Sequence, residues 1–391
     1  MITAPRCATV DTAVRLWVHE CSRVFYDRLI NREDQEWFED LVLELLPRYL
    51  KVSWAKEELF DERCPVIFCD FLKPGADKKL YEESRDMIKM QQILNDSLDE
   101  YNVTFANQMN LVFFADAVVH VARVGRVLRQ PRGNAMLVGV GGSGKQSLTR
   151  IASFVAGFEC VQIEINRGYG LAEFREDIKR LMVKTGVEGN NVTFLFTDTQ
   201  IVVETMLEDL NNVLNSGEIP NLFPQDEQDK IAADMIPVCK ELGIPEARDA
   251  CLSTFVTRVR EYLHVVLCVS PVGDALRVRC RNFPSLINCT TIDWFFPWPE
   301  AALVSVAERF IEGVPLPSDE ASATVRAGLI RMCGVVHTSI KVFAARFYAE
   351  LVRRVYTTPK SYLDLINSYT SKLGVLQGAV ATKAAQMEVR K

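Results

Sequence analysis

From residue 135 onward, short apolar runs alternate with longer amphipathic stretches, which is the pattern of strands followed by helices. The apolar runs predict strands at Met136–Gly139, Cys160–Ile165, Val192–Phe196 and His264–Ser270, with a fifth near Leu286–Ile292. The amphipathic stretches predict helices at Lys145–Val155, Gly170–Val183, Ile201–Asn215 and Glu246–Tyr262. Strands that alternate with helices at this spacing form a parallel sheet covered on both faces. The sequence therefore predicts an α/β domain whose ligands bind at the carboxyl ends of the strands.

The segment before this domain is mostly helical. Its apolar spacing predicts helices at residues 14–25, 34–45, 81–100 and 106–129, and a short strand at residues 65–71. The last of these helices ends in three arginines, Arg123, Arg126 and Arg129. Positive charges at this end suit the negative pole of the helix dipole. We interpret the arginines as stabilising the helix terminus.

The strand pattern ends at a run of aromatic residues and prolines, Trp294–Pro299. Beyond it the pattern predicts only helices, at Glu300–Glu312, Ala321–Cys333, Val342–Tyr356 and from Ser361 onward. A small all-helical domain is therefore expected to begin near Trp298. In its third helix, apolar side chains recur every four residues, which predicts a stripe that faces the core. These side chains are Phe343, Phe347, Leu351 and Val355.

Composition narrows the class of protein. The chain has 391 residues, 48% hydrophobic and 25% charged, which matches a soluble protein of two or three domains. Its net charge of -6 argues against nucleic acid as a partner, because non-specific nucleic-acid binding needs a basic surface. The 11 cysteines include no Cys-x-x-Cys pair, which favours reduced thiols in the cytoplasm. The most apolar run, Leu111–Ala122, is too short to span a membrane.

A glycine-rich stretch, Gly-Val-Gly-Gly-Ser-Gly-Lys-Gln-Ser, follows the first strand of the α/β domain and precedes a helix. This is the order of a phosphate-binding loop, in which backbone N–H groups and the helix N-terminus surround a phosphate chain. The lysine, Lys145, is expected to reach the β- and γ-phosphates. The candidate nucleotide-binding residues here are Gly139, Gly141, Gly142, Ser143, Gly144, Lys145, Gln146 and Ser147.

Two positions depart from the pattern of an active nucleotide hydrolase. The Ser or Thr that normally follows the lysine and ligates magnesium is Gln146 here. The second departure lies at the end of the strand that begins at Val192, where only one of two expected carboxylates is present, Asp198. If the strand ends at Phe196, Thr197 takes the magnesium position and Asp198 the position that activates water. If the strand ends one residue later, Asp198 holds magnesium and no carboxylate activates water.

Several stretches together resemble the fourth AAA+ module of an axonemal dynein heavy chain. The resemblance covers nearly the whole chain, and its motifs occur in the same order as in that family. They are residues 130–150, Phe196–Ile201, Val213–Phe223, Phe283–Cys289, Ile292–Phe295 and Thr358–Leu363. The opening helix, residues 15–25, resembles the close of the preceding, third module.

The resemblance implies a division of the chain. Residues 1–55 would be the helical end of the preceding module, and 56–297 the large α/β nucleotide-binding domain. Residues 298–370 would be the small helical domain, and 371–391 the start of the stalk helix. The implied ligand is ATP or ADP, with or without Mg²⁺. The implied partners are neighbouring AAA+ modules of the same heavy chain, the microtubule through the stalk, and other dynein chains. Neither nucleic acid nor membrane is expected as a partner, and the implied location is the cytoskeleton of a cilium or flagellum, in its axoneme.

The resemblance also implies roles for residues outside the loop. Ser270, at the end of a core strand, would sense the γ-phosphate, and Lys360 and Thr197 would lie near the phosphates. Ser147 and Asp198 are the candidate metal ligands, and Asp198 is the candidate catalytic residue. An arginine that serves a neighbouring module is expected among Arg277, Arg279 and Arg281. The strand that begins at Pro65 would pack over the adenine ring or simply belong to the core.

Three functions remain open from the residues. The first is a regulatory module that binds ATP or ADP with weak or no hydrolysis, which the intact loop and the altered positions at Gln146 and Thr197 favour. The second is an active P-loop hydrolase or a nucleotide kinase, which would need a second carboxylate or a mobile lid, with Arg167 as its nearest arginine. The third is a structural spacer whose loop binds nothing.

Overall fold

The computed structural model describes residues 9–61, 65–76, 79–314 and 320–388. The chain separates into two compact units. The first consists of Met1–Gly139 and Gly144–Phe295, and the second of Val140–Ser143 and Phe296–Lys391. The first unit holds all of the described β-structure, and the described secondary structure of the second is helical.

The first unit is built on a five-stranded parallel sheet in the order β4-β5-β6-β3-β7. The strands are β3 (Ala135–Gly139), β4 (Glu159–Gln162), β5 (Val192–Thr197), β6 (Leu263–Val269) and β7 (Thr291–Phe295). This confirms the predicted parallel α/β fold. The predicted position of the fifth strand is wrong, because Leu286 lies in the short helix α12 (Ser285–Asn288), which begins directly after Pro284. Proline suits the start of a helix, because its φ angle is already helical.

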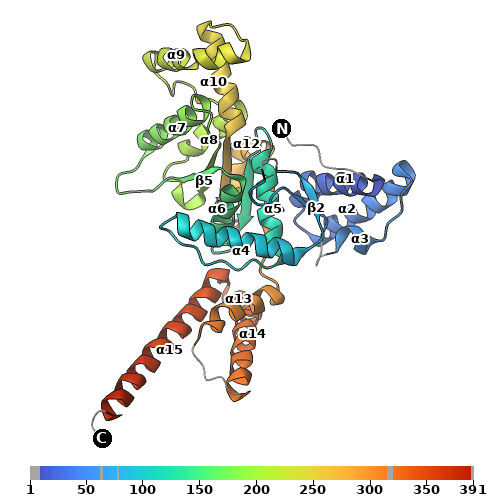
Figure 1. Ribbon diagram of the computed structural model, residues 1–391, viewed down its shortest axis with the longest axis vertical. Coiled ribbons are helices and arrows are strands. Elements are labelled where there is room, and N and C mark those ends of the chain that lie inside the picture. Colours follow the sequence, from blue (N-terminus) through green and yellow to red (C-terminus); the bar gives the residue numbers. More distant parts are fainter. Residues whose placement is uncertain (1–8, 62–64, 77–78, 315–319, 389–391) are drawn as a thin grey trace. The chain divides into compact units, whose positions relative to one another are not determined.

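Side chains that alternate along the central strands enter two separate apolar clusters. Different helices pack on the two faces of the sheet (Figure 1). On one face, Leu137 and Val266 pack with α4 (Met87–Thr104), α5 (Ala115–Arg129) and α6 (Lys145–Ala156). On the other, Val138 and Leu267 join side chains of four helices. These are α7 (Leu171–Gly186), α8 (Thr205–Ser216), α9 (Gln225–Leu242) and α10 (Arg248–Tyr262). Burial on both faces explains why these strands are nearly uninterrupted apolar runs.

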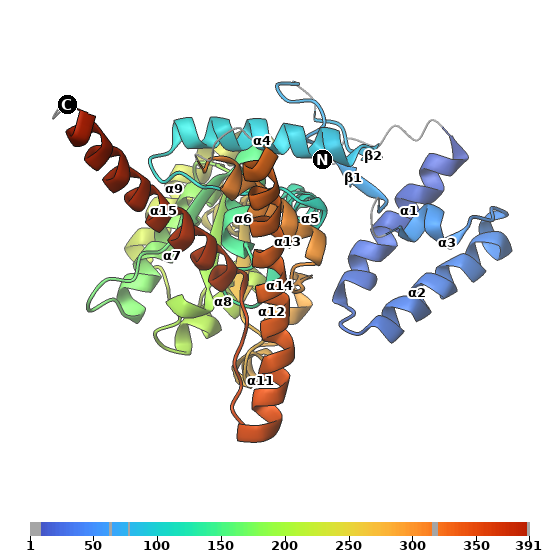
Figure 2. The ribbon, with the colours of Figure 1, turned by 90° about the horizontal axis from the view of Figure 1, so that it is seen from below.

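A third apolar cluster lies in the N-terminal part of the first unit. It holds the helices α1 (Val10–Val24), α2 (Arg32–Leu45) and α3 (Lys56–Phe60) together beside the antiparallel pair β1 (Ile67–Cys69) and β2 (Glu82–Ser84) (Figure 2). Short helical turns follow α1 and α2, at η1 (Tyr26–Arg28) and η2 (Leu46–Leu50). The helix predicted at 81–100 therefore begins later than expected, at Met87, because residues 82–84 pair with β1.

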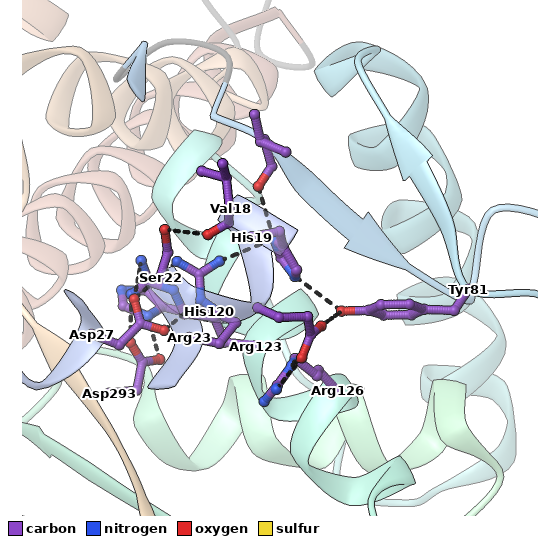
Figure 3. A network of polar contacts seen from close by, with 12 residues as sticks. Val18, His19, Ser22, Arg23, Asp27, Tyr81, His120, Arg123, Arg126 and Asp293 are labelled. Atoms are coloured by element: carbon purple, nitrogen blue, oxygen red, sulfur yellow. Dashed lines mark hydrogen bonds and ion pairs between the residues drawn. The ribbon is translucent and has the colours of Figure 1, made fainter. Parts of the chain in front are cut away.

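The arginines at the end of α5 are ion-paired inside the first unit, so they do more than stabilise a helix terminus. Arg123 lies between two buried carboxylates, with Nη1 2.7 Å from Asp293 and Nη2 3.2 Å from Asp27 (Figure 3). Arg126 pairs with Glu20 of α1, and Arg129 pairs with Asp70.

Two further residues complete this buried polar network. Arg23 of α1 makes a two-pronged contact with Asp27, at 2.5 and 2.9 Å. The Nδ1 of His120 lies 2.7 Å from Asp293. We call Arg23, Asp27, His120, Arg123 and Asp293 the buried ion-pair network. It fastens α1 and η1 to α5 and β7 (Figure 3).

Burial alone would raise the pKa of Asp293, but His120 and Arg123 lower it to about 2. Asp27 and Asp293 likewise raise the pKa of Arg123 against the opposing effect of burial. The charged forms of both residues are therefore the stable ones in the folded protein.

The second unit contains α13 (Glu300–Glu312), α14 (Glu320–Leu351) and α15 (Pro359–Glu388). Tyr362 of α15 is buried among them and donates its hydroxyl to the carbonyl of Leu303 at 2.6 Å. Arg326 of α14 donates to the carbonyls of Ile311, Glu312 and Val314. These contacts fix the ends of α13 against its two neighbours.

Two expectations for this unit are wrong. One helix, α14, replaces the two that were predicted at 321–333 and 342–356, since Gly334 alone does not end it. Its predicted core stripe is also exposed: Phe343 is 62% and Leu351 55% accessible. By length and apolarity alone α14 could cross a membrane, a test that core helices of soluble proteins also pass.

Candidate nucleotide-binding site

The glycine-rich loop turns from the end of β3 at Gly139 into the start of α6 at Lys145. Gly142 and Gly144 adopt φ angles of 79° and 95°, which side chains with a Cβ rarely tolerate. The first α-helical hydrogen bond runs from the N–H of Leu148 to the carbonyl of Gly144, at 2.8 Å. The preceding N–H groups therefore have no partner within the helix and, with the helix dipole, suit an anion.

Lys145 is buried at the base of this loop, with its Nζ donating to the carbonyl of Gly139 at 2.6 Å. Burial lowers the pKa of its ammonium, and the nearby Cys268 and Asp198 oppose that shift only in part. An anion in the loop would stabilise the charged form of Lys145. Lys145 and the N-terminus of α6, both in the first unit, thus suit a phosphate group in charge.

The carboxyl ends of β5 and β6 bring Thr197, Asp198 and Ser270 together. β5 ends at Thr197, and Asp198 opens the helical turn η3 (Asp198–Gln200). The Oδ2 of Asp198 accepts a hydrogen bond from the backbone N–H of Ser270 at 2.9 Å, which ties the ends of the two strands together. The strand end therefore matches the second alignment considered above, in which Asp198 follows directly after the strand and no second carboxylate follows it.

Thr197 is buried and is held by its neighbours. Its N–H donates to Oε1 of Gln200 at 2.8 Å, and its hydroxyl lies 2.8 Å from that of Thr199. Gln200 in turn donates to the carbonyl of Ile163, beyond the end of β4. The side chains of Thr197, Thr199 and Gln200 thus hold this segment at the carboxyl ends of β4 and β5.

Two contacts around Gln146 were not predicted from the sequence. Gln162, the last residue of β4, donates from Nε2 to Oε1 of Gln146 at 3.4 Å. Arg150 of α6 donates to Oε1 of Gln162. The sequence did mark Gln146 as unusual, because a Ser or Thr normally follows the lysine. Nothing in the sequence indicated that Gln146 contacts Gln162. Ser147, the next residue of α6, is partly buried.

The remaining predicted residues lie outside this cluster. Lys360 is an exposed residue at the start of α15. Within the second unit it lies against the loop residue Gly142, where an added Cβ would come within 2.5 Å of the Cβ of Lys360. Arg279 of α11 (Ala275–Asn282) pairs with Glu204 at 2.8 Å, whereas Arg277 and Arg281 are exposed. Arg167 is exposed in the connection between β4 and α7.

The strand β1, proposed to pack over an adenine ring, belongs to the apolar core. Val66 and Phe68 enter the third cluster with the side chains of α1 and α2, and Ile67 enters the cluster shared with α4 and α5. The carbonyl of Val66 accepts a hydrogen bond from Nδ1 of His19 at 2.9 Å. The described contacts of β1 are those of a core strand.

The chain is similar in sequence to known proteins. Residues 109–372 match the family described as "P-loop containing dynein motor region D4". The chain is 51% identical to the human dynein axonemal heavy chain 6 over 362 residues, which is 92% of this chain and 9% of that protein.

Two further relatives are similar at nearly full coverage of this chain. The rat dynein axonemal heavy chain 1 is 45% identical over 375 residues, 96% of this chain and 8% of that protein. The dynein-1-beta heavy chain of the flagellar inner arm I1 complex of Chlamydomonas reinhardtii is 43% identical over 380 residues, 97% of this chain and 8% of that protein. The chain thus spans less than a tenth of the length of these relatives.

Proposed function

Since this chain belongs to the axonemal dynein heavy chains and matches their P-loop motor region D4, we propose that it is a nucleotide-binding regulatory AAA+ module with weak or no hydrolysis of its own. The observation that carries the proposal is a contrast within one site. The buried Lys145 beside the glycine-rich loop supports phosphate binding, whereas the end of β5 offers one carboxylate, Asp198, which already accepts a hydrogen bond from the N–H of Ser270.

In this proposal each part of the site has a stated role. Backbone N–H groups of the loop from Gly139 to Gly144, including Ser143, bind the phosphates, and Lys145 offsets their charge. Thr197 and Ser270 contribute polar groups at the strand ends, and Lys360 contributes a further positive charge. The bound nucleotide, ATP or ADP, acts as a ligand to whose charge the neighbouring AAA+ modules of the heavy chain respond.

We expect weak hydrolysis because the end of β5 offers only one carboxylate, Asp198, where two are expected. Efficient P-loop hydrolases position a water molecule and neutralise the developing charge with metal and cationic groups. Asp198 is fixed by Ser270, and position 146 holds an amide where a hydroxyl would ligate magnesium. The residue at position 146 does not fit the metal, so we derive no step through it. Asp198 and Ser147 stay predictions as metal ligands.

We propose that residues 1–55 end the preceding module, that the large domain spans 56–297 and the small domain 298–370, and that 371–391 begin the stalk. The partners would be neighbouring modules of the same chain, the microtubule through the stalk, and other dynein chains. The location would be the axoneme of a cilium or flagellum, in keeping with the named relatives.

The nucleotide retained by the purified 391-residue chain tests this function. Nucleotide extracted from denatured protein would be identified by chromatography and compared with that from the Lys145→Ala variant. We expect adenine nucleotide in the unaltered chain and little or none in the variant. An empty loop in both, with no binding of added ATP or ADP, would favour a structural spacer. A phosphorylated acceptor in a screen of nucleotides would instead favour the kinase.

A further inference from the structure

A chain of two hydrogen bonds holds Gln146, the residue directly after the loop lysine. Arg150 lies one helical turn later on α6 and donates from its guanidinium to Oε1 of Gln162. Gln162, at the end of β4, donates from Nε2 to Oε1 of Gln146 over 3.4 Å. All three residues belong to the first unit, and the side chain of Gln146 is exposed. We call Arg150, Gln162 and Gln146 the amide relay.

Arg150 fixes the direction of the amide relay. A guanidinium carries only donors, so the oxygen of Gln162 must face it. The nitrogen of Gln162 then faces Gln146, and a donating nitrogen must meet the oxygen of that residue. Turning either amide around would place donor against donor, so the orientation does not depend on an arbitrary choice of amide oxygen and nitrogen. Gln146 therefore directs its oxygen, and not its NH₂ group, toward Gln162 of β4.

An NH₂ group at this position does not fit a magnesium ion. Mg²⁺ takes oxygen ligands, and the Ser or Thr hydroxyl after the lysine supplies one of them in other P-loop proteins. In this chain the oxygen of the corresponding side chain is held by Gln162. Two N–H donors remain, which repel a cation and bind the oxygen of an anion.

We propose that Gln146 is a specificity-determining residue that makes nucleotide binding at this loop independent of Mg²⁺. The inference rests on the proposed function and names its ligand more closely, as a nucleoside di- or triphosphate that carries no metal. The amide of Gln146 donates to a phosphate oxygen, next to Lys145 and the N-terminus of α6. Gln162 and Arg150 act as positioning residues, because they set which end of the amide faces the ligand.

The test measures the affinity of the 391-residue chain for a fluorescent ATP analogue, once with Mg²⁺ and once with excess EDTA. For the unaltered chain we expect the two dissociation constants to agree within about threefold, a difference smaller than one net hydrogen bond. Thermal unfolding without nucleotide checks that each variant is folded. Because Gln146 is exposed, its substitution leaves the core intact.

Three variants separate the role of the amide from that of the loop. Gln146→Thr restores a hydroxyl, and binding should become at least about tenfold tighter with Mg²⁺ than with EDTA. Gln146→Ala removes the donor without adding a ligand, and binding should weaken about tenfold in both buffers alike. Gln162→Glu keeps an acceptor for Arg150 but now accepts from the nitrogen of Gln146. This reverses the amide and should weaken binding in EDTA by about tenfold.

The outcomes separate the two proposals. Nucleotide binding by the unaltered chain that requires Mg²⁺ would overturn the role of Gln146 and leave the proposed function standing. Equal affinities for the unaltered chain together with no new Mg²⁺ dependence in Gln146→Thr would also overturn that role. Binding in neither buffer would overturn the proposed function, and the role of Gln146 with it.

Discussion

Two polar regions each contain a buried cation, and they differ in how that positive charge is paired. In the buried ion-pair network, Arg23 and Arg123 each meet a carboxylate, and the pKa of Asp293 falls to about 2. At the glycine loop, Lys145 meets the carbonyl of Gly139, and burial lowers its pKa. The network satisfies its charges with its own residues, whereas the loop would be stabilised by an added anion.

This difference separates a structural role from a binding role. A buried charge that is paired and hydrogen-bonded holds elements together. Removing one partner leaves the other charge buried and unpaired, which strongly destabilises the folded protein. A buried cation whose pKa is lowered is held in an unfavourable state, which a ligand of opposite charge relieves. We therefore expect substitutions in the network to change stability, and substitutions in the loop to change nucleotide affinity.

The largest effect is expected in the network. Arg123→Met leaves Asp27 and Asp293 without one of their cations, and the free energy of unfolding should fall by about 3–5 kcal/mol. Chemical denaturation measures it. The matched control is Arg32→Met, whose ion pair with Glu36 is about half exposed and should contribute less than about 1 kcal/mol. Similar losses in both variants would show that the network does not hold α1 and η1 in place.

The opposite result is expected at the loop. Lys145→Met should weaken the binding of ATP by about 100-fold, since one charge-assisted contact to phosphate is worth about 1.5–3 kcal/mol. The stability of the nucleotide-free chain should change by less than about 1 kcal/mol, because the substitution also removes the cost of burying an ammonium. Calorimetric titration with ATP and denaturation without it measure the two quantities. A large loss of stability with unchanged affinity would reverse the comparison.

The pH dependence of stability tests the role of His19, a buried residue of α1. His19 is neutral when folded, because burial, and then the charge of Arg23, lower its pKa well below 6.5. Its Nδ1 donates to the carbonyl of Val66 at 2.9 Å, and its Nε2 lies 2.9 Å from the hydroxyl of Tyr81, which donates to Glu20. Below pH 6.5 the unfolded chain takes up a proton at this residue and the folded chain does not, so stability is present above that pH and falls as pH decreases.

A matched variant measures how much stability is lost at low pH because of His19. His19→Gln keeps one donor and one acceptor but does not titrate. Between pH 6.5 and 5.5 the unaltered chain should lose up to about 1 kcal/mol more stability than the variant, within the limit of about 1.4 kcal/mol per pH unit for one proton. Denaturation midpoints at the two pH values give the difference. Equal losses in both proteins would mean that His19 is not the group responsible.

The smallest effect is expected at Asp198. Asp198→Asn keeps an oxygen that can accept from the N–H of Ser270, so stability should change by less than about 1 kcal/mol. If Asp198 activates no water, the slow rate of ATP hydrolysis should also stay the same. Phosphate release at saturating ATP, compared between the two proteins, measures this. A steep fall in the rate would assign Asp198 a catalytic role.

The parts of the fold that could be predicted are those with local signals. The strand, glycine loop and helix from Ala135 to Ala156 lie within one residue of their predicted bounds, because a short apolar run and glycines in sequence mark them. The helix α9 was not predicted, and Pro237 within it breaks the usual pattern. The stripe on α14 has helical spacing, but spacing cannot tell whether a neighbouring element covers it.

The parts of the fold and of the site that could not be predicted depend on contacts between residues distant in the sequence. His120 and Asp293 are 173 residues apart, and Gln146 and Gln162 come from different elements. Their residue types are ordinary for a helix or a strand end, so only the fold reveals the pairing. The sequence pattern did identify Gln146 as unusual, and the structure supplies the partner that orients it.

The most direct test of the central claim is a single-turnover experiment on the 391-residue chain. ATP labelled at the γ-phosphate, added below the concentration of protein and with Mg²⁺ present, is followed by separating bound ATP from ADP and phosphate. We predict that ATP binds and remains intact, with a rate of hydrolysis below about 10⁻² s⁻¹, no faster than slow P-loop nucleotide hydrolases. Rapid, Mg²⁺-dependent conversion to ADP that Asp198→Asn abolishes would contradict the account.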